Sequence, residues 1–546
     1  DAKIVVKKGT FSDESAIKYA ANGADINIAL QADRNASGIF LGENKNVKVT
    51  FDLGGKTLNF KAPAVGSNGT ENQAFHIEQG NQLFTLQNGK VTIDANAKGA
   101  FRFIIQNYND LTVDGVELDG TNLAYNVNDK VRYTVSNNQG TVNFTGNTTI
   151  KAAAENGIAF DVCKNGNYTA PTVTWASTGT VTGGIELTGG KFVVSKNLAV
   201  SVPVMAESGE SILEIGSGAT LSAADNFSDP NPLVKTKTAT APVQVKRGAS
   251  LTINGQGTVG GTKTYSAVLV TVDGDEGETK TATLTVDGNV TLQGDYYGIA
   301  GNGSRHNTKI TVKGGTIMGL HNNDNLGIYH PQEGTLTISG GTITGYSTAV
   351  ELRAGTLSVT GGTLESTADT YSCVKSDGGT TTVGAALAIA QHNTKKDINV
   401  TLSGGTFEGL RTVNVENPQN NDGANVSVSI SGGTYNATDF AVFNNDARTT
   451  VSISKGEFKA TNTASGRGIA VYARLGSVNI TGGTFENNNN SEATLHVGCP
   501  DAVTGNKTPY LTISGIPTVK NIAEGPYTWG QQGSAPLTVN MANELT

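Results

Sequence analysis

Charged residues and cysteines are scarce in this sequence, and each scarcity excludes a class of protein. Only 16% of the 546 residues are charged, whereas about 25% is usual for a globular protein. Low charge together with abundant β-branched residues argues against disorder. The three cysteines are odd in number and far apart, so they indicate neither a disulfide framework nor a zinc motif. We expect Cys163, Cys373 and Cys499 to be small buried apolar residues.

Basic charge and long apolar runs are also missing. The formal net charge is −8, which argues against nucleic acid and anionic membranes as main partners. No apolar run is long enough to span a bilayer. Glycine is abundant, with 69 residues, but it does not recur at every third position, which excludes collagen. The chain begins at Asp1 rather than at Met, as a processed or trimmed N-terminus would explain.

One repeated pattern dominates the sequence. It reads apolar, Thr or Ser, apolar, any residue, Gly, Gly, Thr, apolar, and most copies follow each other at 21–28 residues. A period of about 20–30 residues is typical of a solenoid. One gap of 43 residues, from Gly361 to Gly404, indicates either two turns or one turn with an insertion near 383–396. Clear copies lie at 310–317, 336–343, 357–364, 400–407, 428–435 and 478–485.

The alternation inside each copy predicts the fold. Apolar residues stand at every second position, which is typical of a strand with one buried face. Glycine suits the tight corners between strands, because it reaches positive φ without a clash. We therefore predict an all-β chain, a right-handed parallel β-helix solenoid of about sixteen turns. We expect an N-terminal cap at 1–45 with a short helix at 12–22, the β-helix at 46–515, and a C-terminal cap at 516–546.

The repeat copies also carry a family resemblance. ISGGTITG stands at 338–345, VTGGTLES at 359–366 and LSGGTFEG at 402–409, while VTFDLGGKTLNF stands at 49–60. These segments resemble the pectate-lyase-like right-handed parallel β-helix superfamily, and most closely the Gly-Gly-Thr repeat proteins of bacterial surfaces, which are adhesin-like. The resemblance covers about residues 45–515. It implies the fold but not one activity, since this fold hosts lyases, hydrolases, phage tailspikes and adhesins.

Clustered carboxylates would indicate polysaccharide cleavage, because glycosidic bond cleavage needs an acid and a base in fixed positions. The sequence has no Asp-Asp pair. Its only Asp-x-Asp lies in an acidic loop, where Asp273, Asp275 and Glu276 are the candidate ligands for Ca²⁺. The flanking glycines favour a solvated turn instead. We expect no cofactor, with calcium as the one alternative.

One polar patch could serve as a catalytic site. His330 and Glu351 each stand ten residues before the first glycine of their copy, so we expect them to stack on adjacent turns. With Arg353 they would form a set of general base, acid and anion-binding group. The alternative is an ordinary polar surface with a Glu–Arg ion pair.

Glycan contacts are the other candidate function. Tyr296, Tyr297, Tyr329 and Tyr346 fall in the central coils, where exposed rings could stack on sugars or simply pack at corners. Polar insertions at 121–140, 223–241 and 261–281 are further candidates, because insertions in solenoids often form the binding face.

The leading interpretation is a non-catalytic, extracellular structural or adhesive protein on the surface of a cell or a virion. Its expected partners are glycans or a host or cell surface, and copies of itself in a homo-oligomer or larger assembly, without nucleic acid and without a membrane span. One alternative is a polysaccharide lyase or glycosidase of the tailspike type. Another is a self-assembling filament or lattice subunit.

Overall fold

Contacts within the chain divide it into two compact units. The computed structural model describes residues 2–6, 23–42, 46–67, 69–80, 83–97, 99–124, 131–155, 157–229, 240–270, 279–303, 306–376, 379–418, 424–498, 509–528 and 537–541. Unit 1 comprises Asp1–Val234 and Pro242–Val259, and unit 2 comprises Lys235–Ala241 and Gly260–Thr546. The expected helix at 12–22, the candidate calcium ligands Asp273, Asp275 and Glu276, and Cys499 lie outside the described residues.

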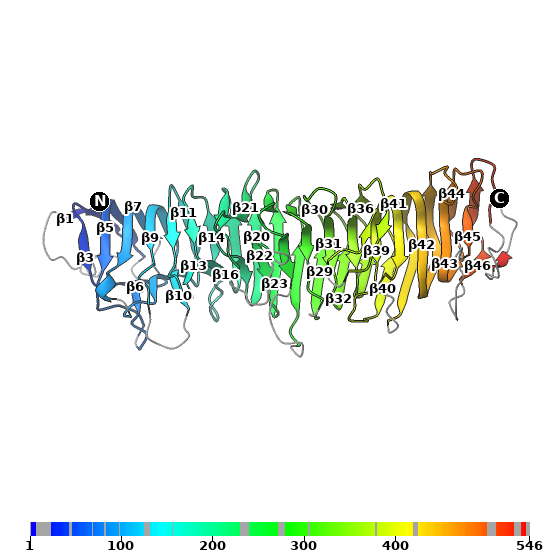
Figure 1. Ribbon diagram of the computed structural model, residues 1–546. Helices are drawn as coiled ribbons and strands as arrows, with labels where there is room; N and C mark the ends of the chain where they lie inside the picture. Colours follow the sequence, from blue (N-terminus) through cyan, green and yellow to red (C-terminus); the bar gives the residue numbers. More distant parts are fainter. Residues whose placement is uncertain are drawn as a thin grey trace. The chain divides into compact units, whose positions relative to one another are not determined.

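Unit 2 is a stack of three-stranded coils. Every strand pairs in parallel with the equivalent strand of the next coil, so that Leu336 lies opposite Leu357 and Ile343 opposite Leu364. The sheets of such stacked strands can be followed in Figure 1. One coil consists of β31 (Leu326–His330), β32 (Gly334–Ile338) and β33 (Thr342–Gly345), and it pairs with β34 (Thr348–Leu352), β35 (Gly355–Val359) and β36 (Thr363–Ser366).

Unit 1 is built in the same way, which confirms the predicted parallel β-helix. The described residues contain no α-helix, and their only antiparallel pair of strands is β37 (Ser372–Cys373) with β38 (Thr382–Val383), in unit 2. No helix among them is long and apolar enough to cross a membrane. One coil of unit 1 consists of β13 (Gly157–Val162), β14 (Thr172–Trp175) and β15 (Val181–Thr182), and it pairs with β16 (Gly184–Leu187), β17 (Gly190–Val194) and β18 (Leu198–Val200).

The Gly-Gly pair of the repeat is required by the corner between the second and third strands. A Cβ on Gly340 would lie 2.3 Å from the carbonyl oxygen of Lys313 in the preceding coil. Gly341 has a φ of +81°, a left-handed conformation that residues with a Cβ rarely adopt. The first glycine therefore permits close stacking of coils, and the second permits the turn.

Side chains face inward and outward as the alternation predicts. Ile338 is buried in the coil interior, whereas its neighbour Ser339 is exposed. Two of the cysteines depart from the expectation, because Cys163 and Cys373 are free thiols that are only half-buried.

The gap of 43 residues is one turn with two insertions. β34 pairs directly with β39 (Ala385–Ile389), and β35 pairs directly with β40 (Ile398–Leu402). The larger insertion, residues 367–384, contains β37 and β38 and is called the strap below. The smaller one, 390–397, lies between β39 and β40. The expected position, 383–396, covers the second insertion and misses most of the first.

Candidate functional site

A row of side chains faces outward from the sheet of unit 2 that contains β34 and β39. Asn414 of β41 (Thr406–Glu416) lies opposite Phe443 of β42 (Val426–Ala460). Phe443 lies opposite Tyr472 of β43 (Ile469–Ile480), which lies opposite His496 of β45 (Leu495–Val497). Because the strands are in register, residues far apart in sequence form one continuous surface.

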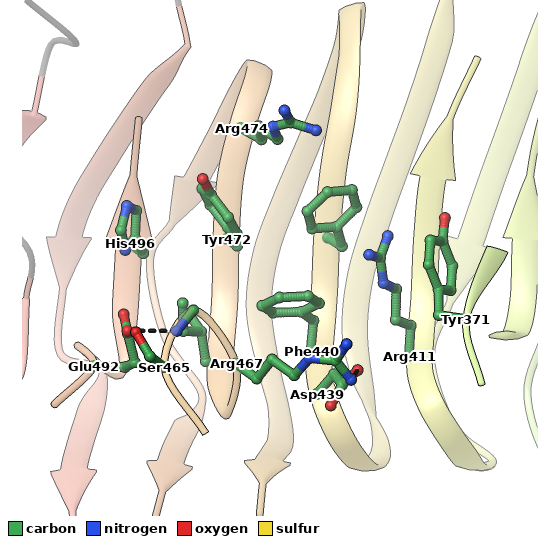
Figure 2. Close-up of a pocket in the computed structure, with 13 residues that line it drawn as sticks. Tyr371, Arg411, Asp439, Phe440, Ser465, Arg467, Tyr472, Arg474, Glu492 and His496 are labelled. Atoms are coloured by element: carbon green, nitrogen blue, oxygen red, sulfur yellow. Dashed lines mark hydrogen bonds and ion pairs between the residues drawn. The ribbon is translucent and has the colours of Figure 1, made fainter. Parts of the chain in front are cut away.

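An open groove of about 490 Å³ lies over this row (Figure 2). Its floor is apolar, since Phe440, Phe443, Ile469 and Tyr472 pack together and are all largely buried. The rings meet at angles, with the Phe443 and Tyr472 centroids 5.5 Å apart. The full lining is Tyr371, Arg411, Asp439, Phe440, Phe443, Ser465, Gly466, Arg467, Ile469, Tyr472, Arg474, Glu492 and His496.

Arg411 is clamped between two aromatic rings at one side of the groove. Its guanidinium carbon lies 3.3 Å from the ring centroid of Tyr371, which belongs to the strap, and 4.0 Å from that of Phe443. Nη1 donates a hydrogen bond of 2.8 Å to Oδ1 of Asn414. Burial lowers the pKa of Arg411, but an arginine remains charged in proteins. The strap and the sheet therefore hold a fixed positive charge in the groove.

Both carboxylates of the groove hold a loop, residues 461–468, at its rim. Oδ1 of Asp439 accepts a 2.7 Å hydrogen bond from Asn462, and its Oδ2 forms a 3.1 Å ion pair with Arg467. Glu492 accepts a 2.6 Å hydrogen bond from the backbone N–H of Gly466, which Figure 2 shows as a dashed line to the loop. These carboxylates are engaged in positioning the rim.

The expected stacking of His330 on Glu351 is wrong. His330 lies opposite Leu352, and Glu351 lies opposite Tyr329. The offset arises at the corner, because residues 331–333 connect β31 to β32, whereas only 353–354 connect β34 to β35. Counting back from the glycines therefore misplaced the pair by one residue, which moves a side chain to the opposite face of the strand.

All three residues of the expected catalytic patch are fully buried. Thr381 donates its backbone N–H to Glu351 at 2.9 Å, and Arg353 donates to the carbonyl oxygens of Ser376 (2.7 Å) and Gly379 (2.9 Å). Glu351 and Arg353 thus fasten the strap over the sheet. Burial raises the pKa of Glu351.

His330 is buried at the end of β31, and its burial lowers its pKa to about 4. It is therefore neutral at physiological pH.

The four candidate tyrosines lie outside the groove. Tyr297 and Tyr329 are buried and stack on each other, and the backbone N–H of Gly379 in the strap donates to the Tyr329 hydroxyl at 3.1 Å. Tyr296 and Tyr346 are half-buried. Tyr296 stacks between the rings of Tyr265 and His321, and Tyr346 donates a 3.0 Å hydrogen bond to Asp369.

Unit 1 contains a pair of carboxylates that the sequence search missed. Asp161 of β13 lies directly opposite Glu186 of β16; Asp161 is buried and Glu186 is half-buried. Ser136 donates a 3.0 Å hydrogen bond to Asp161, and Tyr133 donates a 3.2 Å hydrogen bond to Glu186. Burial raises the pKa of each carboxyl to about 7.

Neither Asp-Asp nor Asp-x-Asp spacing could reveal this pair, because its members lie on neighbouring turns. Asp161 and Glu186 are 25 residues apart (186 − 161), which is one turn of the solenoid, and a search at that spacing would have found them. Among the described residues, no group of three or more His, Cys, Asp or Glu side chains is placed to hold a metal ion.

Comparisons with known proteins identify no relative. Neither the protein-family models nor the curated proteins nor the solved structures contain a match to the chain.

Proposed function

We propose that the protein is a non-catalytic, extracellular surface protein that binds a saccharide in the groove of unit 2. The observation that carries the proposal is the aromatic floor of the groove beneath a polar rim. Sugars present apolar faces that pack on aromatic rings and hydroxyls that take hydrogen bonds. A concave site of about 490 Å³ falls within the range of small-ligand sites.

Binding without cleavage is supported by the state of the two groove carboxylates. Acid–base cleavage of a glycosidic bond needs one carboxyl group to give a proton and another to act as base or nucleophile. Asp439 and Glu492 instead accept hydrogen bonds from the rim loop, and Asp439 is also paired with Arg467. Protonating or moving either one would release the rim.

Display on a cell or a virion, and assembly of several copies, complete the proposal. A saccharide groove on the side of a stacked solenoid suits a protein that contacts another surface. Several weak sites on one assembly would then raise the overall affinity through multivalency.

Titration with an oligosaccharide panel tests the proposal, with isothermal calorimetry on the full chain and on two variants. Tyr472→Ala should weaken binding about tenfold or more, because it removes a ring from the floor. Tyr510→Ala is the matched control, since Tyr510 is a half-exposed tyrosine of unit 2 that does not line the groove. Absence of binding by the unmodified chain, or equal losses in the two variants, would refute the proposal.

A polysaccharide-cleaving enzyme is the second candidate, and the Asp161–Glu186 pair favours it. Asp161 and Glu186 face each other on adjacent strands. Adjacent strands lie about 4.8 Å apart, and retaining glycosidases hold their two carboxyl groups roughly 5 Å apart. Asp161, however, is only 5% exposed and already accepts hydrogen bonds from Ser136 and from the backbone of Asn137.

Screening neutral and acidic polysaccharides for new reducing ends or unsaturated products tests this second candidate. Turnover that disappears in Glu186→Gln, in a variant that melts like the unmodified chain, would establish the enzyme. No turnover on any substrate would leave the binding function alone.

A further inference from the structure

Arg411 is held firmly in the groove by the aromatic rings around it. Tyr371 covers one face of its guanidinium at 3.3 Å, and Phe443 covers it at 4.0 Å, with Phe440 a little further at 5.0 Å. Figure 2 shows Arg411 rising from its strand beside Tyr371. With its planar group held by rings, little conformational entropy remains to be lost when it binds a ligand.

The hydrogen bonds of Arg411 use only part of its donor set. A guanidinium has five N–H donors. Nη1 donates to Asn414 at 2.8 Å and lies 3.4 Å from Oε2 of Glu416. Nε is buried and donates to no acceptor in the described part of the chain. An arginine that leaves a donor unused beside a cavity can donate to an acceptor that a ligand brings.

Glu416, whose carboxylate accepts a hydrogen bond from Arg411, is shared with other donors. Glu416 also accepts the hydroxyl of Tyr371 through Oε2 and the amide of Asn445, at 2.9 Å, through Oε1. It contacts Arg411 only through Nη1. Asp439 also lies near enough to act on the charge of Arg411, but it is paired with Arg467.

The remaining charges of the groove balance, because Arg467 and Arg474 are matched by Asp439 and Glu492. Three arginines and two carboxylates line it, a formal excess of one positive charge (3 − 2), in a chain whose net charge is −8. Arg467 is half-exposed and paired with Asp439. Arg474 is drawn at the top of Figure 2, across the aromatic rings from Arg467.

We propose that the groove selects a saccharide carrying an oxyanion, a carboxylate or a sulfate, and that Arg411 is the residue that determines this specificity. The inference rests on the proposed binding function and deepens it. The sugar ring packs on the floor formed by Phe440, Phe443 and Tyr472, and its anionic group takes the donors that Arg411 leaves unused. Arginine suits this role because its planar fork matches an oxyanion.

Calorimetry with four probes on the full chain tests the inference: sialylated, uronate-containing, sulfated and neutral oligosaccharides of similar length. Anionic probes should bind about ten- to hundredfold more tightly than neutral ones, as charge-assisted hydrogen bonds predict. Arg411→Met keeps an apolar stem in the clamp and should abolish that preference, because it removes the guanidinium donors. Comparing carboxylated with sulfated probes assigns the anion.

Two further variants keep the test decisive. Lys459→Met removes an exposed cation of β42 that is outside the groove, and it should leave the preference unchanged. Arg411→Lys keeps the charge without the fork, and it replaces Arg411→Met if the latter unfolds; a partial loss of preference is expected. Equal affinity of the unmodified chain for neutral and anionic probes would overturn the inference and leave the binding function standing. Failure of every probe to bind would overturn both.

Discussion

The ring of Tyr371 lies on the guanidinium of Arg411, with the guanidinium carbon 3.3 Å from the ring centroid. Tyr371 belongs to the strap. Arg411 of β41 lies opposite Ala385, the first residue of β39 after the strap. The contact joins an insertion of one coil to the groove of the coils that follow it. The strap therefore contributes to the groove as well as covering Glu351.

Replacing Tyr371 should expose this link. Tyr371→Ala removes one face of the clamp, and we expect unfolding to become easier by about 1–2 kcal/mol, the range of a desolvated cation–π contact. Tyr371→Phe keeps the ring and loses only the hydrogen bonds of the hydroxyl to Glu416 and Asn414, so it should lose less stability. Urea denaturation of the three proteins measures the difference. Equal losses in both variants would show that the hydroxyl, rather than the ring, holds Arg411.

The carboxyl pair in unit 1 predicts a pH dependence of stability. Asp161 and Glu186 have folded-state pKa values of about 7, raised by burial from ordinary values near 4. The folded state then binds more protons than the unfolded state between about pH 4 and pH 7, so the free energy of unfolding falls as pH rises through this window. Below pH 4 both states are protonated, and the full contribution is present.

Tryptophan fluorescence can measure this dependence in unit 1 alone. The sequence has two tryptophans, so a Trp529→Phe background leaves Trp175, buried in β14, as the only reporter. The urea midpoint should fall from pH 4.5 to pH 7.5, and Asp161→Asn should flatten the fall. Glu214→Gln, which removes an exposed partner of Lys191, is the matched control. A midpoint that rises over this range would contradict the assignment.

Adjacent positions of β32 and its corner should differ sharply in their tolerance of charge. Ile338→Asp places an unpaired carboxylate in the coil interior, and we expect a loss of about 3–5 kcal/mol. Ser339→Asp, one position on, faces solvent and should cost less than about 1 kcal/mol. Thermal denaturation of both variants checks the assignment, which fails if they lose similar stability.

Gly340 tests the close approach of neighbouring coils on its own, because its φ does not lie in the left-handed region. Gly340→Ala should be strongly destabilising, because its Cβ would lie 2.3 Å from the carbonyl oxygen of Lys313. Gly166→Ala separates the two effects, since Gly166 has a φ of +55° with no atom within 4 Å of the added Cβ. It should cost only about 1 kcal/mol. Chemical denaturation should therefore rank Gly340→Ala well below Gly166→Ala in stability.

The fold could be predicted from the repeat because the same local features, the alternation and the glycine pair, recur from coil to coil. Alternation set which side chains face inward, as Ile338 and Ser339 show, and the glycine pair marked a corner of fixed length. The same reasoning failed for His330 and Glu351, because the next corner differs in length by one residue between their coils. Nothing within either copy of the repeat records that difference.

The groove could not be predicted from the repeat for a different reason. Its floor residues Phe440, Phe443 and Tyr472 belong to neighbouring coils, and its clamp needs Tyr371 from an insertion. Only the positions 443 and 472, about one turn apart, carried a signal: both hold aromatic rings. The side of the groove formed by Tyr371 depends on how the strap packs on the sheet. That packing follows from contacts such as those of Arg353 with Ser376 and Gly379.

The constant glycine corner also determines where such a chain can grow. Three residues connect the second strand to the third both before and after the strap, at 360–362 and at 403–405. Between these corners the chain gains 22 residues over its shortest period of 21 (43 − 21), yet Leu357 still lies opposite Val400 and Leu364 opposite Phe407. Two sheets thus keep their alignment while the perimeter lengthens at the other two corners. New segments with new binding chemistry can enter there without disturbing the layers on either side.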